Sequence, residues 1–255
     1  MLIHPNVLVN IPENYNAIFD VFRADTPELL DRVYRLRHQV YCVENAFEDP
    51  KLHLDGREID ADDDRSAHTL LVHRSSDAAV GTARVVRSLP GKSLPIQGLL
   101  TPDDQQAFEA LPLETTAEIS RFAVSKDFRR RQGELAGNVN LLTGDKRDER
   151  SLRPHLTFGL MAGILAICRE YGITHVCAVM EPSLIRLLAR SGLNFEAIGG
   201  LVDYHGLRQP CVARLTDMVD HSRHQDTLLW QYAGRETGLI SRHDQPSALG
   251  ALQHD

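Results

Sequence analysis

Charged side chains of the kinds used in acid–base chemistry and ion pairing gather in a few parts of this chain. The segment GREIDADDDRSAH, over residues 56–68, carries five carboxylates within seven positions. Carboxylates at this density repel one another unless cations lie close to them. Three arginines fall inside segments with the pattern of a helix or strand, and an arginine that faces a core needs a carboxylate partner. The acids are Glu58, Asp60, Asp62, Asp63 and Asp64, and the arginines are Arg37, Arg84 and Arg121.

The sequence leaves three interpretations of the acidic segment open. It is a solvated turn, a calcium loop, or one half of an ion-paired wall that recognises an amine-bearing substrate. The calcium interpretation lacks support in the spacing, since the central glycine and the closing glutamate of an EF-hand loop are missing. The third interpretation takes Arg37, Arg84 and Arg121 as the partners of the acids.

Another group of polar residues lies in the strand-like segment Glu118–Phe122. Side chains of a strand alternate between its two faces, so we expect Glu118 and Ser120 on one face and Arg121 on the other. This arrangement presents a base on one side of the strand and an anchoring ion pair on the other.

The periodicity around these groups predicts the elements that hold them. Apolar residues recur at helical spacing over residues 27–41, with Thr26 as the N-cap and Pro27 at the first helical position. Two strand-like runs joined by a Ser-Ser-Asp turn predict a hairpin. An early helix, a hairpin and then alternating strands and helices are typical of one α/β domain with a mixed central sheet. The expected elements are hairpin strands 67–74 and 79–87, helices 102–111, 156–171, 183–191 and 217–232, strands 115–124 and 174–180, and a glycine-rich region over 198–206.

Length, composition and charge exclude several classes of protein. The 255 residues are 42% hydrophobic, with 28 basic and 35 acidic side chains, which indicates a folded, mildly acidic protein rather than a disordered chain or a nucleic-acid binder. No apolar run reaches the roughly 18 residues of a membrane span, and the N-terminus lacks a signal-peptide pattern. We therefore expect a cytoplasmic protein.

Cysteine spacing indicates which sites the chain lacks, and the polarity of its C-terminal part indicates where the main domain ends. Four widely spaced cysteines without a CxxC pair are typical of reduced core thiols and not of a zinc or disulfide site. We predict neither a metal nor a bound cofactor. We assign residues 1–215 to one domain and residues 216–255 to a polar, partly helical C-terminal extension with a flexible end.

Four linked motifs resemble, in order and spacing, the signature of acyl-homoserine-lactone synthases and the related long-chain N-acyl amino acid synthases. Residues 181–188 and 204–211 further resemble the C-terminal half of acyltransferases associated with PEP-CTERM/exosortase systems. These families share the GNAT-type N-acyltransferase fold, so the resemblance implies an α/β protein with a mixed central sheet flanked by helices. The motifs are Arg37-x3-Tyr41-x5-Phe47, Glu58-x-Asp60-x2-Asp63, Gly81-x2-Arg84 and Glu118-x-Ser120-Arg121-Phe122.

The resemblance also implies roles for individual residues. Glu118 would assist deprotonation of the amine that attacks an acyl thioester, since only a neutral amine is nucleophilic, with Ser120 and Arg121 beside it. Backbone N–H groups where the strand splays after Glu118 would stabilise the oxyanion. The substrate-binding residues would be Arg37, Tyr41, Phe47, Glu58, Asp60, Asp63 and Arg84.

Departures from the family pattern affect the expected substrates. Homoserine-lactone synthases usually carry Trp at the position of Phe47 and Phe at that of Tyr41, so an amino acid is favoured over S-adenosylmethionine as acceptor. Residues 130–135 match only the first half of a phosphate-cradling loop, which favours acyl carrier protein over coenzyme A as donor. An acidic carrier protein would dock on a basic patch made of Arg129, Arg130, Arg131, Lys146, Arg147, Arg150 and Arg153.

The expected function is therefore transfer of a medium or long acyl chain from acyl carrier protein to the amine of an amino acid or similar small molecule. Two alternatives remain. One is an acyl-homoserine-lactone synthase that consumes S-adenosylmethionine, and the other is a non-catalytic protein that binds an acyl group or acyl carrier protein.

Overall fold

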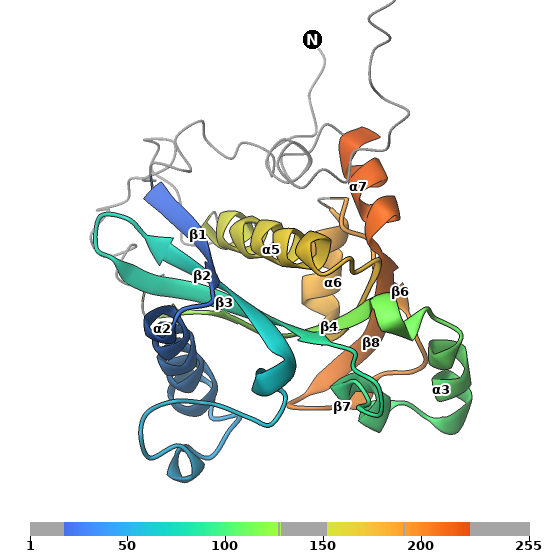
Figure 1. Ribbon diagram of the computed structural model, residues 1–255, viewed down its shortest axis with the longest axis horizontal. Coiled ribbons are helices and arrows are strands. Elements are labelled where there is room, and N and C mark those ends of the chain that lie inside the picture. The colour runs from blue at the N-terminus through green and yellow to red at the C-terminus, as the bar shows by residue number, and fades with distance from the viewer. Residues whose placement is uncertain (1–17, 127, 129–151, 191, 225–255) are drawn as a thin grey trace, which may run out of the picture.

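The strands form one twisted sheet (Figure 1) in the computed structural model, which describes residues 18–126, 128, 152–190 and 192–224. The strand order is β1-β2-β3-β4-β5-β8-β6, and β7 pairs with β8. Strands β4 and β5 run parallel, and the other neighbouring strands run antiparallel. The expected mixed sheet is confirmed. The strands are β1 (Phe19–Ala24), β2 (Ser66–His73), β3 (Ala78–Arg87), β4 (Thr116–Val124), β5 (His175–Met180), β6 (Glu196–Ala197), β7 (Val202–Asp203) and β8 (Leu207–Arg214).

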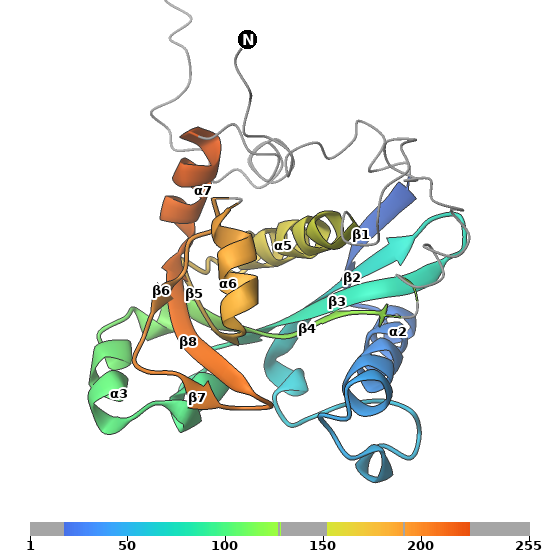
Figure 2. The same ribbon diagram turned by 180° about the vertical axis from the view of Figure 1, so that it is seen from behind.

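Helices cover both faces of the sheet. Helices α5 and α6 lie on one face and α2 lies on the other, as the two opposite views show (Figures 1 and 2). No helix among the described residues is long and apolar enough to cross a membrane. The helices are α2 (Pro27–His38), α3 (Pro102–Glu109), α5 (Leu152–Glu170), α6 (Pro182–Ala189) and α7 (Leu215–His224), with short turns η1 (Gln39–Glu44), η2 (Pro50–Leu52), η3 (Asp63–Arg65), η4 (Pro95–Leu99) and η5 (Leu113–Thr115).

The first predicted helix is confirmed, with a change of geometry near its end. Thr26 Oγ1 accepts a hydrogen bond from the Leu29 N–H at 3.3 Å, and Pro27 occupies the first turn. After His38 the helix continues as the π-helical turn η1. One face of α2 is buried against the sheet, and this face includes Arg37 beside Val33 and Leu36.

The predicted hairpin is confirmed as β2 and β3, whereas the sequence predicts no strand at β1 and only a strand pair without bounds in the region of β7 and β8. Strand β1 pairs with β2, and residues 209–214 of β8 pair with the whole of β5. The sequence of β1, FDVFRA, is short and mixed in polarity, and β8 contains Pro210, which sequence patterns associate with breaks in a strand. Strand β1 pairs with residues 44 to 54 positions away in the chain, and β8 pairs with residues of β5 that are 29 to 39 positions away, so both depend on distant partners.

A β-bulge in β4 changes the direction of Arg121. Thr82 pairs with Ala123 and Arg84 pairs with Ser120, so two residues of β4 face a single residue of β3. Arg121 lies in the bulge with a φ of 50°. A bulge of this kind re-aims the side chains that follow it. The expectation that Arg121 points away from Ser120 was therefore wrong, because Asp60 contacts both Arg121 and Arg84, the cross-strand partner of Ser120.

Strands β4 and β5 separate after a short paired region. Their pairing runs from Thr116 opposite His175 to Glu118 opposite Cys177. Both strands then continue for several residues without pairing to each other. The expected splay after Glu118 is thus confirmed, and the polar backbone groups along the facing edges need other partners there.

Helix α5 packs across the sheet through a close contact at Gly163. A Cβ atom at this position would lie 2.8 Å from Thr69 Cβ and 3.0 Å from Val21 Cγ1. Neighbouring side chains of α5, Leu160 and Ile164, are completely buried. The four cysteines are free and buried, as expected for core thiols.

The C-terminal extension that we assign to residues 216–255 begins inside α7. Leu215 and Met218 belong to the same buried cluster as α5, and Val219 is buried as well. Residues 225–255 lie outside the described part of the chain, so the boundary at residue 215 stays a prediction.

Replacing Gly163 with Ala should lower the free energy of unfolding by about 1–2 kcal/mol, because the strain of an overpacked contact exceeds the gain in helix propensity. Urea unfolding followed by circular dichroism measures this difference. Gly200→Ala is the control, since no atom lies within 4 Å of its added methyl group. Equal stability of the two variants would contradict the close packing of α5 on β2.

Candidate active site

A cleft of about 610 Å³ opens where β4 and β5 separate. On the α2 side of the sheet its lining includes the polar side chains of Asn45, Asp60 and Arg84. On the opposite side it is lined by side chains of α5 and α6, among them Met161, Leu184 and Leu187. The expected catalytic residues Glu118, Ser120 and Arg121 all line the cleft, together with Tyr41, Phe47, Asp60 and Arg84 from the expected binding set.

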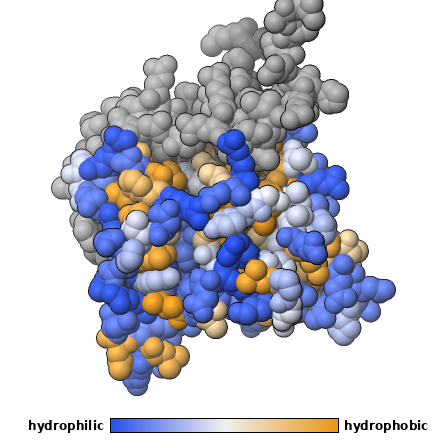
Figure 3. All heavy atoms as spheres, in the orientation of Figure 1, coloured by the Kyte–Doolittle hydropathy of each residue, from blue (hydrophilic) through white to orange (hydrophobic). Residues whose placement is uncertain are grey.

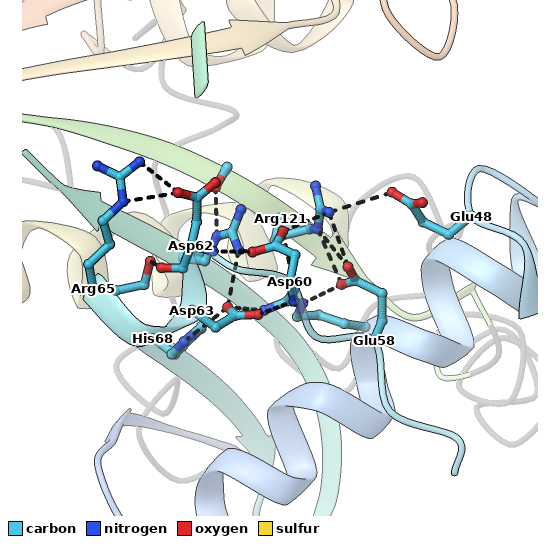
Figure 4. Close-up of polar contacts among 12 residues, drawn as sticks. Glu48, Glu58, Asp60, Asp62, Asp63, Arg65, His68 and Arg121 are labelled. Atoms are coloured by element: carbon cyan, nitrogen blue, oxygen red, sulfur yellow. Dashed lines mark hydrogen bonds and ion pairs between the residues drawn. The ribbon is translucent and has the colours of Figure 1, made fainter. Parts of the chain in front are cut away.

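Six charged side chains form a closed circle of ion pairs beside the cleft, which we call the ion-pair ring. Acids and arginines alternate around it, so every arginine contacts at least two carboxylates and every carboxylate contacts at least two arginines. Figure 4 shows four members of this circle, Glu58, Asp60, Asp63 and Arg121. Three positive and three negative charges make the ring neutral. The contacts run Arg37–Glu58, Glu58–Arg121, Arg121–Asp60, Asp60–Arg84, Arg84–Asp63 and Asp63–Arg37, with N···O distances of 2.5, 3.0, 3.0, 2.5, 3.1 and 2.6 Å.

The geometry of the ring matches the third interpretation of the acidic segment, in which acids pair with arginines. Burial raises the pKa of the Asp63 carboxyl, but hydrogen bonding and the charges of Arg37 and Arg84 outweigh it and lower the pKa to about 2. At Glu58 burial again raises the pKa of the carboxyl. Hydrogen bonds and charges of Arg37 and Arg121 outweigh this effect, so the pKa is lowered. Among the described residues, no group of three or more His, Cys, Asp or Glu side chains is arranged to hold a metal ion.

The ring divides the expected binding residues into an inner and an outer set. Arg37, Glu58 and Asp63 are buried and do not line the cleft. They hold Arg84, Asp60 and Arg121, which do line it. The inner set therefore positions the outer set and has no access to a ligand in the cleft.

His68 lies under the ring without a hydrogen bond. Its Nε2 atom is 3.5 Å from Asp63 Oδ1, and neither ring nitrogen has a hydrogen-bond partner among the described residues. Burial lowers the pKa of His68 to about 4, which the charge of Asp63 offsets only in part. The imidazole is therefore neutral at pH 7.

Glu118 differs from the ring carboxylates because no arginine pairs with it among the described residues. Its side chain is 4% exposed, and its Oε2 accepts a hydrogen bond from the Ile96 N–H at 2.7 Å. Burial raises the pKa of Glu118 to about 7, while this hydrogen bond and the charge of Arg84 offset the effect only partly. At neutral pH the group is thus divided between its acidic and basic forms, as suits a general base.

Ser120 holds Arg84 in place on the polar side of the cleft. Its Oγ accepts a hydrogen bond from Arg84 Nε at 3.0 Å. This contact fixes the plane of the Arg84 guanidinium, whose Nη1 points to Asp60 and Asp63. Ser120 is therefore a support for Arg84 and lines the cleft next to Glu118.

Aromatic rings close one end of the cleft. The rings of Tyr41 and Phe47 are 6.1 Å apart, and Phe47 lies 5.2 Å from the ring of His205 on the β7–β8 hairpin. The Arg121 guanidinium lies 5.3 Å from the Tyr41 ring centre. This aromatic group links the segment after α2 to the C-terminal hairpin.

The loop between Phe47 and Glu58 is held by these contacts rather than by a hydrophobic core. Leu52 and Leu54 on this loop are 76% and 90% exposed. Figure 3 shows hydrophobic residues at the lower left corner, where this loop lies, on a face that is otherwise mostly hydrophilic. The buried Glu58 therefore anchors the loop to the rest of the site through the ion-pair ring.

Lys126, Arg208 and Glu181 are charged residues of the cleft that the sequence did not single out. Arg208 on β8 and Glu181 before α6 form an ion pair with an N···O distance of 2.5 Å, and both line the cleft. Their segments carry no dense charge pattern, and the bounds of β8 were not predicted, so only the resemblance of residues 181–188 and 204–211 to a family pointed to them.

The expected docking patch for acyl carrier protein lies almost entirely outside the described residues. Six of its seven residues are outside the described part of the chain. The seventh, Arg153, lies in the first turn of α5, where side chains are not described. The patch stays a prediction for Arg129, Arg130, Arg131, Lys146, Arg147, Arg150 and Arg153.

Replacing Arg37 with Met should lower the free energy of unfolding by about 3–5 kcal/mol, because Glu58 and Asp63 would keep buried charges without this partner. Arg35→Met on the same helix is the matched control, since the Arg35 side chain is 54% exposed and Asp31 is its ion-pair partner among the described residues; its effect should stay within about 1 kcal/mol. Denaturant unfolding measures both variants. Similar losses in the two would contradict the buried ring.

Comparisons with known proteins bear on the fold. A family model described as an acetyltransferase (GNAT) domain matches residues 36–137. No curated protein is significantly similar to the chain in sequence.

Solved structures are similar over most of the chain. FeeM, an N-acyl amino acid synthase from uncultured soil microbes, has a TM-score of 0.53 and 15% identity, covering 82% of this chain and 97% of FeeM. BjaI, a CoA-dependent acyl-homoserine lactone synthase solved with SAM and isopentyl-CoA, has a TM-score of 0.52 and 20% identity, covering 82% and 90%. The AHL synthase LasI has a TM-score of 0.50 and 17% identity, covering 76% and 87%. At these identities the likeness establishes the fold alone: the chain has the mixed α/β GNAT fold, with a central sheet flanked by helices.

Proposed function

We propose that this protein is an N-acyltransferase that moves a medium or long acyl chain from a carrier thioester to the amine of an amino acid or similar small molecule. The observation that carries the proposal is Glu118, a carboxyl group with a pKa of about 7 that lines a cleft at the point where β4 and β5 separate. The resemblance of the four sequence motifs to N-acyl amino acid synthases supports the same reaction.

The reaction follows from the groups around this point. The amine of the acceptor loses its proton to Glu118, directly or through one water, and attacks the thioester carbonyl carbon. Beyond Glu118 the edge of β4 no longer pairs with β5, so among the described residues backbone N–H groups along this edge are available to an oxyanion. When the tetrahedral intermediate collapses, the carbon–sulfur bond breaks and the thiol leaves with a proton. No cysteine or serine nucleophile takes part.

The two sides of the cleft suit the two substrates. The side lined by Asp60, Arg84 and Glu118 is polar and carboxylate-rich, which suits an amine acceptor. Met161, Leu184 and Leu187 on the other side offer an apolar surface to an acyl chain. The donor that we propose is acyl carrier protein, docked on the basic residues between 129 and 153, with acyl-CoA as the alternative donor.

The two alternative functions, a lactone synthase and a non-catalytic binding protein, can be told apart from this one by what happens to the substrates. An acyl-homoserine-lactone synthase would consume S-adenosylmethionine during turnover. A non-catalytic binding protein would form a stable complex with the acyl carrier without loss of the thioester. The raised pKa of Glu118 at the cleft supports a catalyst over a binding protein. Association with a PEP-CTERM system remains a prediction from the resemblance.

Incubation of the protein with acyl carrier protein thioesters and a mixture of proteinogenic amino acids should release N-acyl amino acids, which mass spectrometry identifies. Parallel reactions contain acyl-CoA as donor or S-adenosylmethionine as acceptor. Lipid extracts of cells expressing the wild type should contain the same product, and cells expressing Glu118→Gln should lack it. Thioester consumption only with S-adenosylmethionine would overturn the amino acid assignment in favour of a lactone synthase.

Glu118→Gln should reduce turnover by about 10²–10⁴-fold, because the amide cannot accept the proton of the amine. The wild-type rate should rise with pH through about 7, since only the ionised carboxylate is a base. This step should vanish in the variant, whereas the ionisation of the acceptor amine remains in both proteins. Glu114→Gln, an exposed position four residues earlier, is the control and should behave as wild type. Near-normal turnover of Glu118→Gln would remove the assignment.

A further inference from the structure

Arg208 enters the cleft from the β7–β8 hairpin as a fixed cation. Its guanidinium donates hydrogen bonds to the carbonyl oxygens of Tyr204 at 3.2 Å and His205 at 3.1 Å. The hairpin tip is itself constrained, because His205 and Gly206 both have positive φ. The Arg208 side chain is 13% exposed and lies 6.0 Å from the centre of the Phe47 ring. The cation is thus held in place before any ligand binds.

The partner of Arg208 is exposed and replaceable. Glu181 contacts Nη1 of Arg208 at 2.5 Å, yet the Glu181 side chain is 55% exposed. A half-exposed carboxylate regains water when it leaves its partner, so ion pairs of this kind contribute little to stability. A ligand carboxylate can therefore take the place of Glu181 without leaving a buried charge unpaired.

The other cations that line the cleft are not available in the same way. Arg84 and Arg121 each contact two carboxylates of the ion-pair ring. Lys126 lies eight residues beyond Glu118 along β4 and its continuation, and its Nζ donates to Asn45 Oδ1 and to the Glu44 carbonyl oxygen.

We propose that Arg208 binds a carboxylate of the acceptor in place of Glu181, so that the acceptor belongs to the class of amines that carry a carboxylate. This inference rests on the proposed N-acyltransferase function. It adds a specificity-determining residue that lies outside the motifs quoted from the sequence. Glu181 acts as the resting counter-ion of Arg208 and competes with the acceptor.

The position of Arg208 favours the acceptor over the donor as its ligand. Arg208 touches Phe47 on the polar side of the cleft, where Asp60 and Glu48 are also found around Arg121. With Glu48 added to the neutral ring, the acids around Arg121, Arg84 and Arg37 outnumber these arginines by one, so this side disfavours the phosphate of a donor's pantetheine arm and attracts an amine. A zwitterionic acceptor fits both features, with its ammonium group toward the acids and its carboxylate on Arg208.

The test compares acceptors with and without the carboxylate. Wild type and Arg208→Gln are assayed with a mixture of amino acids and with the matching mixture of amino acid amides, at fixed acyl carrier protein thioester. Arg208→Gln should raise the KM for the acids by about 10- to 100-fold and leave that for the amides nearly unchanged. Comparing the acid-to-amide ratio between the two proteins cancels the difference in amine reactivity. The KM for the donor should not move.

Two further variants separate recognition from folding. Glu181→Gln removes the competing carboxylate, so it should lower the acceptor KM, a direction that simple loss of structure does not produce. Arg214→Gln, at an exposed position on the same strand outside the cleft lining, should match wild type with both mixtures. Equal losses on acids and amides in Arg208→Gln, or a raised donor KM instead, would overturn the inference.

A binding measurement keeps the inference independent of turnover. Amino acids at millimolar concentration should raise the melting temperature of wild type and Arg214→Gln more than the amides do, and this difference should disappear in Arg208→Gln. Turnover without an Arg208-dependent preference would overturn the inference and leave the proposed function standing. Arg208-dependent stabilisation by acids without any turnover would support the inference and count against the proposed function. Absence of both effects would overturn both.

Discussion

The alternation of three arginines and three carboxylates in the ion-pair ring is the constraint on which the rest of this site depends. Taking any one of these charges out of water is costly, and the cost is offset only while its two partners are in place. The ring joins α2, the acidic segment before β2, and strands β3 and β4. Formation of the ring therefore requires these four segments to be correctly assembled, and it fixes the polar wall of the cleft.

The bulge in β4 is what allows this wall to exist. Without the extra residue, strand alternation would send Ser120 and Arg121 to opposite faces. With it, Arg121 reaches Glu58 and Asp60 while Ser120 holds Arg84 on the same side. The splay from β5 begins directly after Glu118, so one stretch of β4 supplies the base, Arg121, the serine that holds Arg84 and a backbone edge that does not pair with β5.

Because the ion-pair ring is neutral, proton transfer and recognition of a ligand charge fall to groups outside it. Because each ring charge has two partners, the ring presents an ordered but balanced surface to the cleft. Glu118 remains without a cationic partner among the described residues, and Arg208 has a partner that water can replace. One group is suited to exchange a proton and the other to exchange a carboxylate, which divides proton transfer and recognition between strands β4 and β8.

The sequence by itself determined the fold class, the hairpin, the first helix and the set of charged residues, because these follow from local periodicity, capping and residue type. The tertiary structure alone decided which arginine meets which acid and which of them reach the cleft. It also decided the direction of Arg121, since a bulge arises from register against β3 and has no local signature. Strands β1 and β8, and with β8 the Arg208–Glu181 pair, depend on pairing between distant segments, which no local pattern encodes.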